Sequence, residues 1–94
     1  FDLARLNMIL ALLEKKLNLP FNQYDVFINV TGGIKITEPA ADLAVIAAIV
    51  SSFRDRKISK ESVFIGEVSL VGDIRDVPGL EQRIKEAANL GFTK

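Results

Sequence analysis

Charged side chains supply the only obvious chemistry in this 94-residue sequence, because it contains no Cys and no His. That composition excludes thiol nucleophiles, imidazole bases, disulfides and Cys/His metal sites. Four carboxylates, Glu38, Asp42, Glu67 and Glu81, are enough to imagine a hydrolytic site. The alternative assigns them to helix capping and surface charge, and the sequence favours that alternative. We therefore predict no metal site and no bound cofactor.

One basic cluster offers a different chemistry. Its cations are Arg54, Arg56, Lys57 and Lys60. They are either a solvated loop or a patch that contacts the phosphates of DNA, and Arg5 and Arg75 are further candidate contacts. The chain has 12 basic and 12 acidic residues, so any such surface must be local. The cluster is not interleaved with aromatic residues, which argues against a single-strand stacking platform.

Three helices are predicted to position these charges. Residues 3–17 carry an apolar stripe after a capping Asp2, and Asn18 and Pro20 end that helix. A central helix starts near Glu38, with Thr37 as its cap and Pro39 in its first turn. Residues 43–50 of this central helix are apolar all round, which predicts burial on most sides.

The apolar stripe of the first helix, over residues 3–17, consists of Leu3, Leu6, Ile9, Leu10, Leu13 and Leu17.

The third helix follows Gly79 or Asp76 and ends at Gly91, with Phe92 as the hydrophobic partner of that stop. Its predicted inner face consists of Leu80, Ile84, Ala87 and Ala88.

Alternating apolar residues predict strands at residues 24–30, 34–36, 62–70 and 74–77. The last two are joined by a turn at residues 71–73 and form a hairpin. Together with the helices they predict a single α+β domain over residues 1–94. We expect it to be a fragment of a longer chain whose flanking strands are absent. The longest apolar run is about half the length that a bilayer requires, so no membrane span is predicted.

Two stretches resemble Lon-type peptidase domains. Residues 66–83 resemble the hairpin and following helix of that family, and residues 37–42 resemble the start of its buried helix. The resemblance implies a two-layer Lon peptidase-like (ribosomal protein S5 domain 2-like) fold, with helices on a mixed β-sheet. It places the family's Ser nucleophile at Ala40 and its Lys base at Glu81. Neither side chain can perform that role, so no catalytic residue is expected.

A closer resemblance is to the C-terminal domain of the RadA (Sms) family of bacterial DNA-repair ATPases. It extends over nearly the whole chain and is carried by residues 5–8, 25–33, 38–44 and 51–56. That resemblance implies a non-catalytic scaffold that contacts DNA in a cytoplasmic protein. The parent protein would be a ring-forming homo-oligomer that promotes branch migration alongside RecA recombinase. ATP, Mg and Zn would belong to the zinc-finger and RecA-like ATPase domains, which are not in these residues. The alternatives are a pure oligomerisation module and, less favoured, a peptidase.

Overall fold

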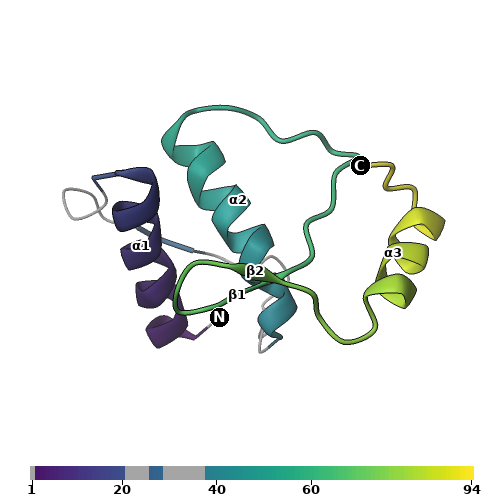
Figure 1. The fold of residues 1–94 in the computed structure, drawn as a ribbon. Coiled ribbons are helices and arrows are strands. Elements are labelled where there is room, and N and C mark those ends of the chain that lie inside the picture. The colour runs from purple at the N-terminus through teal and green to yellow at the C-terminus, as the bar shows by residue number, and fades with distance from the viewer. Residues whose placement is uncertain (1, 21–25, 29–37) are drawn as a thin grey trace.

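Three helices and one short β-hairpin make up the part of the chain that the structure, a computed structural model, describes: residues 2–20, 26–28 and 38–94. The predicted small α+β domain is confirmed. Figure 1 shows α1 beside α2, the hairpin crossing in front of α2, and α3 at the other end of the molecule. In chain order the elements are α1 (Leu3–Leu17), the 3₁₀ turn η3 (Pro39–Ala41), α2 (Asp42–Phe53), β1 (Glu67–Val68), β2 (Ile74–Arg75) and α3 (Leu80–Asn89).

Helix α1 begins and ends where the sequence predicts. The Asp2 carboxylate accepts a hydrogen bond of 3.0 Å from the Ala4 N–H, and Asn18 adopts a left-handed conformation (φ 57°) beyond the last turn. The buried face is narrower than the predicted stripe. Only Ile9 and Leu13 are buried, because α2 and Leu19 cover the middle of the helix and not its ends.

The 3₁₀ turn η3 leads directly into helix α2 and has Pro39 at its first position, as predicted. The proposed cap at Thr37 lies outside the described residues. The prediction that α2 is buried on most sides is wrong, because only Asp42 and Ile49 of the helix are buried. Helix α1 covers one side and β1 contacts the first turns, which leaves the other side chains half-buried or exposed.

The hairpin is antiparallel, with Glu67 opposite Arg75 and Val68 opposite Ile74. Gly72 closes its turn with a positive φ of 91°. Both strands are much shorter than predicted, because the backbone of residues 61–66 pairs elsewhere. The Gly66 N–H donates to the Ala40 carbonyl (3.0 Å), and the Val63 N–H donates to the Lys94 carbonyl (2.9 Å).

The predicted mixed sheet is not present in the part of the chain that the structure describes, where the sheet has two antiparallel strands. The strand predicted at residues 34–36 lies outside the described residues. Of the strand predicted at residues 24–30, only residues 26–28 are described, and they do not belong to a strand.

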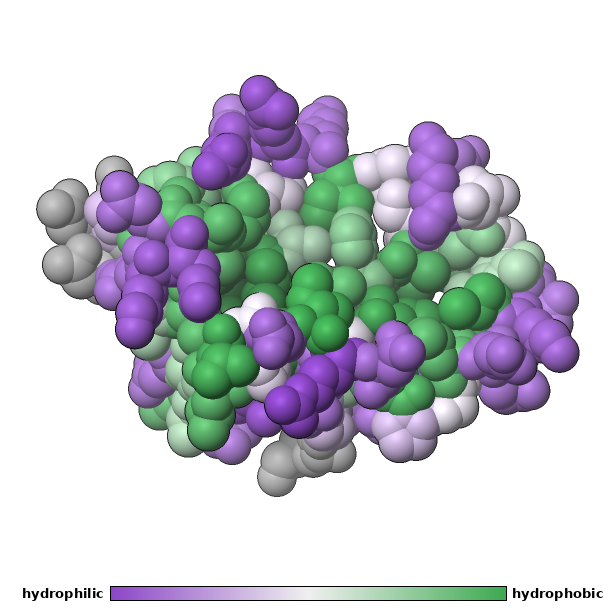
Figure 2. All heavy atoms as spheres, in the orientation of Figure 1, coloured by the Kyte–Doolittle hydropathy of each residue, from purple (hydrophilic) through white to green (hydrophobic). Residues whose placement is uncertain are grey.

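Helix α3 ends as predicted, in a Schellman motif. The Gly91 N–H donates to the Ala88 carbonyl (3.1 Å) and the Phe92 N–H to the Ala87 carbonyl (3.0 Å). The prediction that this helix has a buried inner face is wrong, because α3 has no buried residue and Ile84 is 54% exposed. Figure 2 shows that apolar side chains are spread over the middle of this face of the molecule.

Candidate functional site

The C-terminus of α2 fixes the start of the basic loop, defined here as residues 54–60. The Asp55 N–H donates to the Ser52 carbonyl (3.2 Å) and the Arg56 N–H to the Ser51 carbonyl (2.9 Å), while the Ser51 hydroxyl donates to the Arg56 carbonyl. This is a Schellman motif in which Asp55, with φ 51°, takes the left-handed position that usually holds Gly. The helix end therefore positions the first two arginines of the loop.

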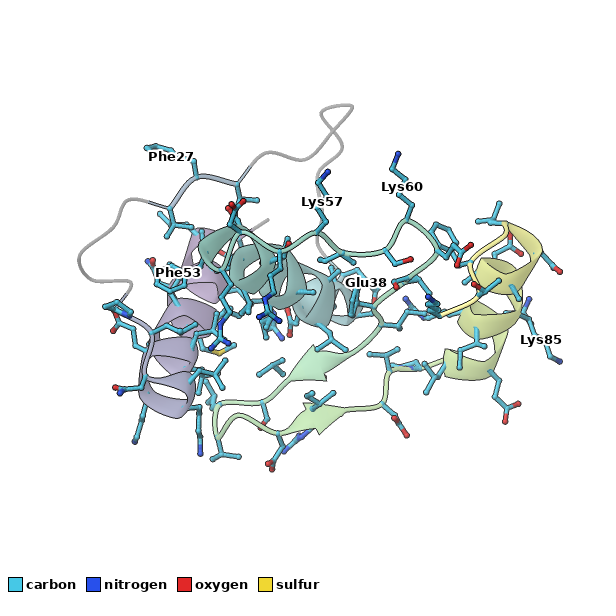
Figure 3. The ribbon with its side chains drawn as sticks, turned by 90° about the horizontal axis from the view of Figure 1, so that it is seen from above. Phe27, Glu38, Phe53, Lys57, Lys60 and Lys85 are labelled. Atoms are coloured by element: carbon cyan, nitrogen blue, oxygen red, sulfur yellow. The ribbon has the colours of Figure 1, made fainter. Side chains whose placement is uncertain are left out.

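All four predicted DNA-contacting cations lie in this loop and are exposed. None of them forms a salt bridge with any residue that the structure describes. Figure 3 shows Lys57 and Lys60 projecting from the same side of the loop, away from the body of the molecule. The cluster consists of Arg54, Arg56, Lys57 and Lys60.

Arg5, a further predicted contact for DNA, pairs with a buried carboxylate, and its side chain is 28% exposed. Its Nε donates to Asp42 Oδ1 (2.6 Å) and its Nη2 donates to Asp42 Oδ2, in a two-pronged ion pair. The hydrogen bond to Asp42 raises the pKa of Arg5 above its ordinary value, although burial acts in the opposite direction. Arg75 lies in β2 and is exposed, remote in sequence from the basic loop.

Asp42 is fully buried and connects three elements. Besides its ion pair with Arg5 of α1, its Oδ2 accepts a hydrogen bond of 2.9 Å from the Val68 N–H of β1. Glu67 reaches the same guanidinium from outside, at 3.5 Å. Sequence reasoning missed this network. The available signal was a single carboxylate at the start of an otherwise apolar helix, where burial requires a cationic partner.

Of the four carboxylates that suggested hydrolysis, Asp42 and Glu67 share one cationic partner, Arg5. Asp42 is neutralised by Arg5, Glu38 accepts from Arg83 at 3.3 Å, and Glu81 is exposed in the first turn of α3. In residues 2–20, 26–28 and 38–94, no three carboxylates are grouped so that they could hold a metal ion. The same residues contain no helix that is long and apolar enough to cross a membrane.

Ala40, at the nucleophile position of the Lon resemblance, is buried in η3 beside an open, mainly apolar cavity of about 500 Å³. Residues 63–65 and the N-terminal and C-terminal turns of α3 form the other walls, and Figure 2 shows the surface hollowed in this region. Gln82 and Arg83 contribute to the lining, whereas Glu81 is not among the residues around this cavity. Ala40 therefore lies at this cavity, and Glu81 lies in the first turn of α3.

Comparison with known proteins gives two findings. A family model described as subunit ChlI of Mg-chelatase matches residues 5–94. The chain is also similar to curated proteins named DNA repair protein RadA.

In Helicobacter pylori the identity is 63% over 94 residues, which is 100% of this chain and 21% of the relative. In Campylobacter jejuni it is 59% over 87 residues, covering 93% of this chain and 20% of the relative. In Synechocystis it is 48% over 93 residues, covering 99% of this chain and 18% of the relative. The chain thus spans about a fifth of the length of these relatives.

Proposed function

We infer a function from the premise that this chain belongs to the family described as subunit ChlI of Mg-chelatase. The family name points to metal insertion, yet the described residues offer no cluster of metal ligands. The similar curated proteins are instead named for DNA repair. We propose that the chain is a non-catalytic scaffold domain that contacts DNA within a DNA-repair protein.

The observation that carries this proposal is the basic loop. Lys57 and Lys60 are exposed, project together, and form no salt bridge with any described residue. Their charges are therefore free to replace the counterions of nucleic-acid phosphates. The chain as a whole has a net charge of zero, so the proposed affinity of a single copy is weak and depends on this one surface.

A Lon-like architecture without Lon chemistry is the second part of the proposal. It is supported by the hairpin that leads into α3 and by the buried turn that leads into α2. Ala40 has no nucleophile, and Glu81 is a carboxylate where that chemistry needs an amine. If this is right, the chain cleaves no unfolded peptide, and any cleavage that disappears in Glu81→Ala would contradict it.

The role of the whole protein is also a proposal, because the chain spans only about a fifth of its relatives. We propose that the parent is a cytoplasmic DNA-dependent ATPase that forms a ring and promotes branch migration with RecA recombinase. ATP, Mg and Zn would be bound by its other domains and not by this one. Several weak DNA contacts arranged in a ring would add up, because linked sites raise the effective concentration.

The test is a salt series of DNA binding with two variants. Lys57→Ala combined with Lys60→Ala should weaken binding and reduce the salt dependence, by about 0.9 in log–log slope for each phosphate that the variant no longer neutralises. Lys85→Ala is the matched control, because Lys85 projects from α3 at the other end of the molecule. An unchanged affinity and slope in the double variant would mean that the basic loop is not the DNA surface.

A pure oligomerisation module is the second candidate function. It is favoured by the exposed apolar side chains of the hairpin and of α3, including Leu70 and Leu90. Sedimentation of the wild-type chain distinguishes the two candidates. Self-association that Leu90→Asp abolishes, combined with no DNA binding at low salt, would favour the oligomerisation module.

A further inference from the structure

Lys60 lies at a tight turn that ends the basic loop. The Ser62 N–H donates to the Ser59 carbonyl (3.1 Å), which closes a turn with Lys60 and Glu61 at its two central positions. The Ser59 hydroxyl accepts a second hydrogen bond, of 3.2 Å, from the Glu61 N–H. These bonds fix the backbone that carries the Lys60 side chain, which projects away from the body of the molecule (Figure 3).

Residues 93 and 94, which follow α3, hold this turn from the other side. The Glu61 carbonyl accepts hydrogen bonds from the N–H groups of Thr93 (2.9 Å) and Lys94 (3.2 Å). The Val63 N–H donates in turn to the Lys94 carbonyl (2.9 Å). Figure 1 shows these two segments side by side, where the chain after α2 reaches the end marked C. The basic loop is thus anchored to α2 at its start and to residues 93–94 just beyond its end.

The side chain of Thr93 makes a further contact with Glu61. Its hydroxyl donates to Glu61 Oε2 at 3.3 Å, at the surface of the molecule. Glu61 also follows Lys60 directly in the chain, and opposite charges this close attract each other. Lys60 nevertheless forms no salt bridge with any residue that the structure describes. The Thr93 hydroxyl therefore gives the Glu61 carboxylate a partner other than the Lys60 ammonium.

We propose that Thr93 is a positioning residue for the DNA contact of Lys60. Its backbone holds the turn in place, and its hydroxyl keeps the Glu61 carboxylate from pairing with the neighbouring ammonium, which stays available to a phosphate. Thr93 itself does not touch the DNA in this arrangement. The inference rests on the proposed function and adds to it a residue outside the basic loop that keeps one of its cations unpaired.

Thr93→Val tests the role of the hydroxyl, because valine has a similar shape and retains the backbone hydrogen bonds. In a salt series with a fluorescently labelled DNA duplex, we expect Thr93→Val to weaken binding about threefold at low salt, since an exposed ion pair between Lys60 and Glu61 is weak. The log–log salt slope should fall toward that of Lys60→Ala. Thr93→Ser, which keeps the hydroxyl, should bind as the wild-type chain does.

Glu61→Gln separates the charge of Glu61 from its place in the turn. Glutamine cannot neutralise Lys60, so in a Glu61→Gln background the Thr93→Val substitution should change neither the affinity nor the salt slope. An equal loss in both backgrounds would overturn the inference, because the hydroxyl would then act on something other than the Glu61 charge. Wild-type affinity and slope in Thr93→Val would overturn it as well.

The double variant Lys57→Ala with Lys60→Ala separates the two proposals. If it still weakens binding while the predictions for Thr93 fail, the inference is wrong and the proposed function stands. If it binds DNA as tightly as the wild-type chain, the proposed function fails and the inference fails with it.

Discussion

The most consequential single residue of the described structure is Asp42, a fully buried carboxylate in a chain of modest size. Its charge is balanced by Arg5, and its second oxygen also accepts from the backbone of Val68. Buried ion pairs of this kind add little over an apolar replacement, but removing one partner leaves an uncompensated charge in the interior. The network therefore determines how α1, α2 and β1 fit together.

Replacing Asp42 with Asn keeps the size of the side chain and removes its charge. We expect the free energy of unfolding to fall by about 2–4 kcal/mol, because Arg5 loses its partner and remains partly buried. Chemical denaturation of Asp42→Asn measures the loss. Glu67→Gln is the control, since Glu67 is more exposed and meets Arg5 only at 3.5 Å, and it should cost less than about 1 kcal/mol. Equal effects of the two variants would contradict the assigned roles.

The same ion pair has a defined pH dependence at the Arg5 end. The pKa of Arg5 is raised in the folded state above its value in the unfolded chain, so the contribution of the pair is fully present below the unfolded pKa and is lost only as the pH rises through the folded pKa. Titration of Arg5 therefore leaves stability near neutral pH unaffected, which denaturation curves recorded across the neutral range can check.

At the scale of the elements, the two Schellman motifs require the same left-handed conformation but place different residues in it. Gly91 suits its position after α3, whereas Asp55 takes the same conformation after α2 with a side chain that disfavours it. Asp55→Gly should raise the free energy of unfolding by about 0.5–1 kcal/mol, and Gly91→Ala should lower it by about 1 kcal/mol. Thermal melts of the two variants show whether each substitution raises or lowers the stability. Destabilisation by Asp55→Gly would mean that its carboxylate has a role that the backbone does not show.

Local sequence signals predicted the element ends better than the packing. Asp2, Asn18, Pro39 and Gly91 act through backbone groups within a few residues, so their positions can be read from the sequence. The lengths of the strands could not be predicted in the same way. Residues 61–66 alternate or are apolar, but their hydrogen bonds go to η3, α2 and the last residues of the chain, which are long-range choices.

In the candidate site, too, local features could be predicted from the sequence and those that depend on packing could not. The basic loop was predicted from residue type alone, and the structure places its cations in solvent at the end of α2. The ion pair between Arg5 and Asp42 depends on which segments pack together, so it could not be predicted from the sequence alone.

At the scale of the whole molecule, α3 is the least integrated element. It has no buried residue, and it is held by the Arg83–Glu38 ion pair of 3.3 Å and by backbone hydrogen bonds between Glu61 and residues 93–94. We expect native-state hydrogen exchange to be faster in α3 than around Ile9 and Leu13 of α1, because few apolar contacts oppose its opening. Mass spectrometry of exchange measures this directly, and equal protection of the two helices would contradict the prediction.

The charge distribution of the whole molecule determines where DNA can bind. Twelve cations and twelve carboxylates cancel over the chain, so a DNA surface exists only where the cations are left unpaired. The most direct measurement is an NMR titration of the isotope-labelled chain with DNA at low salt. We expect chemical-shift changes concentrated in the amides of residues 54–60, with the hairpin and α3 unaffected. Changes confined to the hairpin and α3, with none in residues 54–60, would contradict this expectation.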